Sequence, residues 1–147
     1  MTKKKGAGRS DNMVATLREW QEIELRGVND LSKIMGNTKN SLVRLIMEII
    51  RHDSVMHHRV QQFLIDSETV ASPALTREDL AEIWEMIERH DQSEKRTIEL
   101  ARELLVDAWT PIQKQLLGYL LQDESKHDAL LMQLDEVKRD MNRASGG

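Results

Sequence analysis

The chain contains no cysteine and has few proline, glycine or aromatic residues. Its 147 residues include 2 Pro, 7 Gly and 3% aromatic side chains. Without cysteine the chain can form no disulfide and offers no thiolate ligand or nucleophile, so any bound metal must be held by His and carboxylate groups. The abundance of straight-chain helix formers such as Leu, Met, Glu, Lys and Arg predicts an all-α fold.

The sequence also lacks a large excess of one charge and a long hydrophobic run. Its formal charge is −4, from 21 basic and 25 acidic residues, whereas dedicated polyanion binders are strongly basic. The most apolar window, residues 42–50, is interrupted by Arg44 and Glu48, and the N-terminus has no apolar signal-peptide stretch. We therefore expect a soluble, cytoplasmic protein with neither a nucleic acid nor a membrane as its partner.

Apolar residues return every three or four positions through most of the chain, as a core-facing helix requires. The pattern breaks near residue 37, between residues 67 and 75, and near residue 109. These breaks divide the chain into four predicted helices, which span residues 11–35, 39–66, 77–107 and 111–143. The polar or Gly-rich ends, residues 1–10 and 144–147, are predicted to be flexible tails outside a single domain of residues 11–143.

Two of the predicted helices begin with recognisable capping sequences. Thr76 is followed by Asp79 at the third helical position, and Thr110 is followed by Pro111 and Gln113, as at capped helix N-termini. Residues 66–74, which include serine and proline, form the predicted connection between the two halves. Long helices joined by short links favour an antiparallel four-helix bundle.

The two halves of the chain match when one is shifted by 70 residues without a gap. The polar residues that coincide in this register are Glu24 with Glu94, Asp53 with Asp123, and His57 with His127. Apolar positions coincide too, but any two amphipathic helices share an apolar period, so the polar matches carry the argument. We interpret the chain as a duplicated helix pair.

Each predicted helix interrupts its apolar face near the middle with polar side chains. The Glu and His residues at these inward positions are Glu24, His57, His90, Glu94, Glu124 and His127. An unpaired ionised carboxylate in a dry core costs several kcal/mol or is neutralised by a pKa shift, and a bound cation is the simplest shared compensation. Carboxylate and imidazole ligands suit iron or manganese, and also zinc. The sequence therefore predicts a core site for one or two metal ions.

The second half of this pattern resembles the metal site of the ferritin-like superfamily, which includes ferritin and rubrerythrin. In that superfamily one Glu from each of two helices and a Glu-x-x-His from each of the other two hold a di-iron or di-manganese centre. Glu94, together with Glu124 and His127 at Glu-x-x-His spacing, matches this arrangement in full. The resemblance implies a ferritin-like four-helix bundle over residues 11–140.

The first half departs from the superfamily pattern at one position. Glu24 and His57 match it, but Ser54 stands where the metal-bridging Glu would be. The neighbouring Asp53 is turned by about 100° around the helix and is a poor substitute. His90, one turn before Glu94 in the other half, can supply a compensating ligand.

The resemblance implies iron handling or chemistry with oxygen or peroxide, which would make the protein a non-haem iron oxidoreductase. Long amphipathic bundles often associate, so a homo-oligomer, most simply a dimer, is expected. The alternative is a metal-free bundle that acts as an interaction or regulatory protein, because a fold does not determine a function. A hydrolase using Ser54 beside His57 is rejected, because no oxyanion hole or nucleophile turn is visible.

Overall fold

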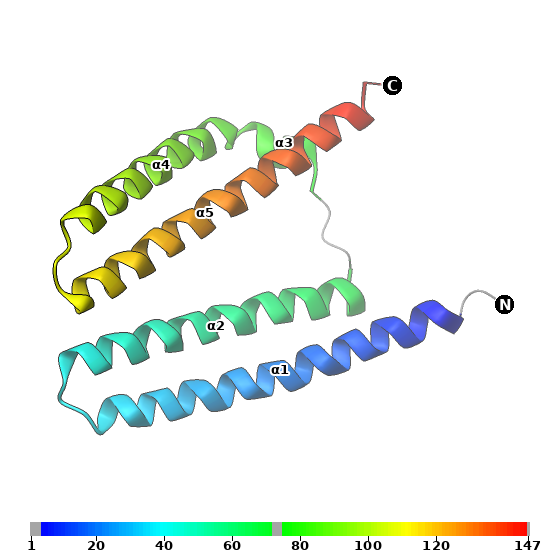
Figure 1. Ribbon diagram of the computed structural model, residues 1–147. Helices are drawn as coiled ribbons and strands as arrows, with labels where there is room; N and C mark the ends of the chain where they lie inside the picture. Colours follow the sequence, from blue (N-terminus) through cyan, green and yellow to red (C-terminus); the bar gives the residue numbers. More distant parts are fainter. Residues whose placement is uncertain (1–3, 72–74, 147) are drawn as a thin grey trace. The chain divides into compact units, whose positions relative to one another are not determined.

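The computed structural model describes residues 4–71 and 75–146, which are helical apart from short connections (Figure 1). The helices are α1 Lys4–Gly36, α2 Ser41–Thr69, α3 Arg77–Ala81, α4 Trp84–Asp107 and α5 Pro111–Ala144. No strand occurs among the described residues, which confirms the predicted all-α class. The chain divides into two compact units, and each is a helical hairpin: α1 with α2, and α4 with α5 preceded by the short α3.

The first hairpin consists of two long helices that run antiparallel and pack against each other along their lengths (Figure 1). α2 begins after Asn40, whose side chain accepts hydrogen bonds from two backbone N–H groups of the first turn. Leu17 of α1 and Ile65 of α2 are buried, with exposures of 7% and 1%. Three buried polar residues belong to the same hairpin: Gln21, Glu24 and Gln61. Its centre is therefore partly polar.

In the second hairpin, α3 and α5 each begin with one of the capping sequences predicted from the chain. The Thr76 side chain accepts a hydrogen bond from the backbone of Asp79 and the Asp79 carboxylate accepts one in return. Thr110 and Gln113 form the same reciprocal arrangement at the start of α5. Both capping predictions are confirmed. Leu80 of α3 is 3% exposed, so this short helix is held by burial of its apolar side chain.

Each hairpin leaves a broad apolar face exposed. On α2 one face is formed by exposed apolar residues at spacings of three, four or ten positions, namely Val43, Ile46, Ile50, Val60 and Leu64. His57 falls in the same series, and it is 59% exposed. On α5 the corresponding positions include Leu120 and Leu130, which are 47% and 56% exposed, and His127 lies between them. These two histidines therefore lie on the open apolar faces of their hairpins.

The helix bounds differ from the sequence predictions in three places. α1 begins at Lys4 and not at residue 11, so residues 4–10, predicted as part of a tail, are helical. α2 continues to Thr69, so the first part of the predicted 66–74 connection is helical, while residues 72–74 lie outside the described residues. The predicted third helix is broken at Glu82 and Ile83 into α3 and α4. Both residues are ordinary helix-compatible types, so periodicity alone runs through the break.

Candidate metal site

The second hairpin brings Glu94 of α4 together with Glu124 and His127 of α5. One potential ligand atom from each of the three residues lies within 4.8 Å of the other two. His127 Nδ1 is 3.6 Å from Glu94 Oε1 and 3.8 Å from Glu124 Oε2. Metal–ligand bonds of about 2.1 Å separate neighbouring ligand atoms of one ion by roughly 3 to 4 Å. The three side chains are therefore spaced as ligands of a single ion would be.

The two carboxyl groups of this cluster contact each other, and their pKa values move in opposite directions. The hydrogen bond with Glu94 is the main cause that raises the pKa of Glu124, and burial raises it further. The same hydrogen bond is the main cause that lowers the pKa of Glu94. Because two adjacent ionised carboxylates repel each other, such a pair holds a proton to a higher pH than a free glutamate does. A cation between the two groups would replace that proton.

Glu94 is the most enclosed member of the cluster. Its side chain is 9% exposed, and its Oε2 atom is buried without an N–H or hydroxyl donor among the described residues. The other oxygen, Oε1, lies 2.8 Å from His90 Nε2, one turn earlier on α4. A buried carboxylate oxygen without a partner loses its hydration without compensation. Glu94 is therefore the group that a bound cation would stabilise most.

Two further side chains support the cluster from α4. His90 is 64% exposed and reaches the cluster through Glu94, but the structure does not group it with the three convergent ligands. The Thr97 hydroxyl donates a hydrogen bond of 3.1 Å to Glu124 Oε2 and thereby orients that carboxylate. Thr97 follows Glu94 by three positions, so its place on the same helix face was visible in the sequence, although its partner on α5 was not.

The first hairpin surrounds Glu24 with hydrogen-bond donors instead of a second carboxylate. Glu24 Oε1 accepts a hydrogen bond of 3.1 Å from Trp20 Nε1 and lies 3.1 Å from His57 Nδ1. Burial raises the pKa of Glu24, but hydrogen bonds from Ser54, His57 and Trp20 outweigh burial and hold the pKa below its ordinary value. The ionised Glu24 is thus stabilised without a cation.

The six predicted ligands are therefore distributed over two different local arrangements. Glu94, Glu124 and His127 converge in the second hairpin, and His90 contacts this cluster through Glu94. Glu24 and His57 contact each other in the first hairpin, where Ser54 occupies the place equivalent to Glu124. In each hairpin the Glu of the first long helix thus lies near the His of the second: Glu24 near His57, and Glu94 near His127.

A pair of aspartates adjacent to the cluster was not predicted from the sequence. Asp91 and Asp128 share a hydrogen bond that is the main cause lowering the pKa of Asp91 and raising the pKa of Asp128. Lys95 Nζ lies 3.0 Å from Asp91 Oδ2. Asp91 precedes Glu94 by three residues and so shares its helix face. The contact with Asp128 depends on the register between two helices, which spacing within one helix does not reveal.

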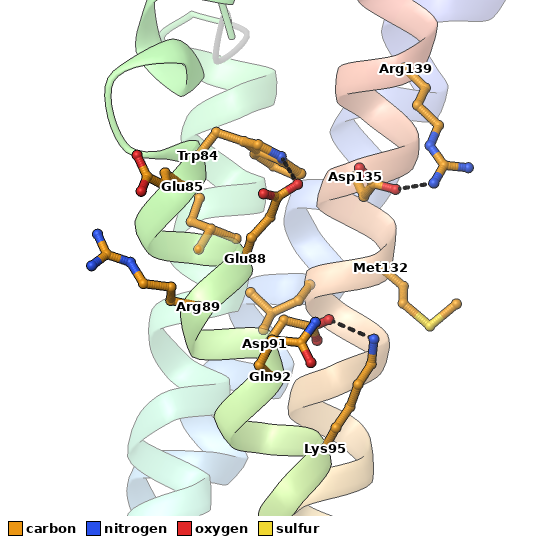
Figure 2. A pocket seen from close by; sticks show the side chains of 12 residues that line it. Trp84, Glu85, Glu88, Arg89, Asp91, Gln92, Lys95, Met132, Asp135 and Arg139 are labelled. Carbon is orange, nitrogen blue, oxygen red and sulfur yellow. Dashed lines mark hydrogen bonds and ion pairs between the residues drawn. The ribbon is translucent and has the colours of Figure 1, made fainter.

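An open cleft of about 670 Å³ lies between α4 and α5 of the second hairpin, and Asp91 of this aspartate pair lines it (Figure 2). Three interactions join side chains that line it: Trp84 Nε1 with Glu88, Lys95 with Asp91, and Arg139 with Asp135. None of the three convergent ligands lines it. The cleft is therefore separate from the candidate metal site.

The shared proton makes the metal-free stability depend on pH. Unfolded Glu has a pKa of about 4.3, so above that pH the folded chain keeps a proton on Glu124 that the unfolded chain releases. Stability therefore falls as pH rises through this window up to the raised pKa of Glu124, whereas the lowered pKa of Glu94 adds stability that is lost as pH falls. We expect Glu124→Gln to reduce the decline, as measured by urea unfolding in EDTA at several pH values, and the part that remains should come from Asp128, whose pKa is also raised. The matched change Glu136→Gln, on an exposed part of α5, should keep the wild-type profile, and identical profiles for both variants would contradict the shared proton.

Comparisons with known proteins do not assign the chain to a family. No protein-family model, curated protein or solved structure matches it. Among the described residues, no helix combines the length and the apolar character needed to cross a membrane. The function is therefore inferred from the geometry within each hairpin.

Proposed function

We propose that the protein binds a divalent transition metal, iron or manganese in the first place, through Glu94, Glu124 and His127. The observation that carries this proposal is the convergence of two carboxylates and one imidazole from two helices within 4.8 Å. Contact between Glu94 and Glu124 is unfavourable when both are ionised, and a cation between them removes the repulsion. His90 is placed to add a fourth ligand after rotation of its side chain away from Glu94.

The donor set favours certain metals. Two carboxylates and one or two imidazoles are hard to intermediate ligands, which suit Fe²⁺ and Mn²⁺ and also accept Zn²⁺. Three protein ligands leave coordination positions for water or for a small oxygen species. Thr97 fixes the orientation of Glu124, as groups that surround a metal site commonly do for its ligands.

We further propose that the open faces of the two hairpins pack together into an antiparallel, ferritin-like four-helix bundle formed by duplication. Two observations support it. Both hairpins expose apolar side chains around their Glu and His residues, and apolar faces of this size need a cover. The aligned side chains also make equivalent local contacts, since Trp20 and His90 each reach the Glu one turn later. In such a bundle Glu24 and His57 would approach the ion from the opposite side.

A bound iron or manganese ion would supply redox chemistry with oxygen or peroxide, which would make the protein a non-haem iron oxidoreductase or an iron-handling protein. The part of the chain in this chemistry is electrostatic. Glu94 and Glu124 provide negative charge that favours a higher oxidation state, and His127 fixes the position of the ion. In the proposed bundle, the apolar residues around them would limit access of bulk water.

Metal binding is tested on the full-length protein prepared without metal. We expect titration with Fe²⁺ under anaerobic conditions, or with Mn²⁺, to give a stoichiometry near one ion per chain by calorimetry and elemental analysis. Because the folded state alone holds the site, metal at 100 times its Kd should add about 2.7 kcal/mol of stability. EDTA should then lower the Tm by roughly 5–10 °C. Trace metal and a Tm that does not respond to EDTA would favour the metal-free interaction protein.

A further inference from the structure

α2 carries a second apolar stripe in addition to the open face that contains His57. The residues of this stripe are Leu45, Ile49, Met56 and Phe63. Leu45, Met56 and Phe63 are 43%, 48% and 58% exposed. Nine residues separate Met56 from the buried Ile65, and at about 100° per residue this places them on opposite sides of the helix. The stripe therefore faces away from α1.

The second hairpin has no such stripe. The residues 70 positions later, on α5, are Gln115, Tyr119, Lys126 and Gln133. α5 has polar or aromatic side chains at these positions, and it still packs into a hairpin. Apolar side chains at these positions are therefore required neither for packing within a hairpin nor for the proposed bundle. Large apolar side chains gathered on one exposed helix edge mark a contact with another molecule. Their presence on α2 alone indicates an interface specific to the first hairpin.

We infer that the protein forms a homodimer in which α2 of one chain packs antiparallel against α2 of a second copy along this stripe. In an isologous contact the same residues face each other across a two-fold axis. With the axis near residue 54, Leu45 of each copy lies opposite Phe63 of the other, and Ile49 and Met56 fill the centre. The spacing of four, seven and seven residues is that of helices packed side by side.

Charges beside the stripe fit this antiparallel pairing. Glu48 and Arg59 lie on the same edge of α2, and in the register that opposes Leu45 to Phe63 they face each other across the axis. The symmetry produces this pair twice. Within the described residues, neither side chain forms an ion pair in its own chain. A parallel pairing would place the Glu48–Arg59 edges of the two copies on opposite sides of the interface, so only the antiparallel contact brings these opposite charges together.

This inference goes beyond metal binding. It rests on the proposed function in one respect: in the proposed bundle the face of α2 that contains His57 packs against the other hairpin, so the second stripe stays free. The test is to measure the molar mass of the full-length protein in solution by sedimentation velocity or light scattering. The protein concentration should be about 10–100 μM, the range in which a small interface is expected to form a dimer. Wild type should have twice the 17.0 kDa chain mass. Glu48→Arg or Arg59→Glu alone should give monomer, and the double variant should restore the dimer, because each reversed charge then meets its complement.

Two further variants make the outcome decisive. Leu45→Gln with Phe63→Gln should also give monomer, while Arg18→Glu with Glu22→Arg on the exposed side of α1 should remain dimeric. Circular dichroism shows that each variant keeps its helices, and metal content should be unchanged, which separates this inference from the proposed function. A monomeric wild type, or a dimer that tolerates either single charge reversal, would overturn the inference. The latter result would indicate a dimer made by exchange of hairpins.

Discussion

His127→Ala is expected to lower the affinity for Fe²⁺ or Mn²⁺ by about a hundredfold or more, whereas His57→Ala should have a much smaller effect. Changes in groups that merely support a metal ligand already cost about 10–100-fold, and His127 is a proposed direct ligand. Its Nδ1 atom lies within 3.6 Å and 3.8 Å of the two carboxylates of the cluster. His57 contacts only Glu24, whose charge is already stabilised by Trp20 and Ser54. Calorimetric titration of the metal-free variants measures the difference.

His52→Ala is the matched control for these two substitutions. His52 is exposed on α2 and lies away from both Glu clusters, so its removal should leave the Kd unchanged. Equal losses for His127→Ala and His57→Ala would mean that both hairpins contribute alike to the ion. In that case the difference between the Glu94–Glu124 pair of the second hairpin and the single hydrogen-bonded Glu24 of the first would have no effect on metal binding.

The sequence predicted those features of the fold that arise from neighbouring residues. The all-α class follows from composition and period, and the N-caps at Thr76 and Thr110 follow from short capping sequences. The early start of α1 and the break between α3 and α4 were missed, because tertiary context decides whether a polar or ordinary segment stays helical. The packing of the two hairpins into a bundle stays a prediction.

In the candidate site too, the sequence predicted the features that arise within one helix. Glu124 and His127 are three residues apart on one helix, so their common face was evident. Their approach to Glu94 depends on the register between α4 and α5, which the resemblance to the superfamily site implied. No such guide existed for Asp91 and Asp128, or for the donors around Glu24. These contacts depend on which residues of two helices come opposite each other, and the period of a single helix does not encode that.

Ser54→Glu is expected to create a second metal site. Ser54 hydrogen-bonds to Glu24, just as Glu124 contacts Glu94 in the other hairpin, so a Glu at position 54 would give the first hairpin the carboxylate pair that it lacks. With His57 beside Glu24, the new carboxylate completes the Glu, Glu and His set of the second hairpin. Elemental analysis of the variant should show metal content rising from about one ion toward two per chain.

The same substitution should destabilise the protein when metal is absent. The Ser54 hydroxyl now donates to an ionised, buried Glu24, and a carboxylate in its place removes a donor and adds a like charge, so both changes raise the free energy of the folded state. Urea unfolding in EDTA should therefore show a loss of stability, and Fe²⁺ or Mn²⁺ should restore it.

Val55→Glu adds the same charge one position further along α2, where the side chain is 47% exposed. That control should change neither metal content nor stability, because its carboxylate points into water. If Ser54→Glu behaved like Val55→Glu in both measurements, position 54 would not face Glu24, and the correspondence between the two hairpins would have to be given up.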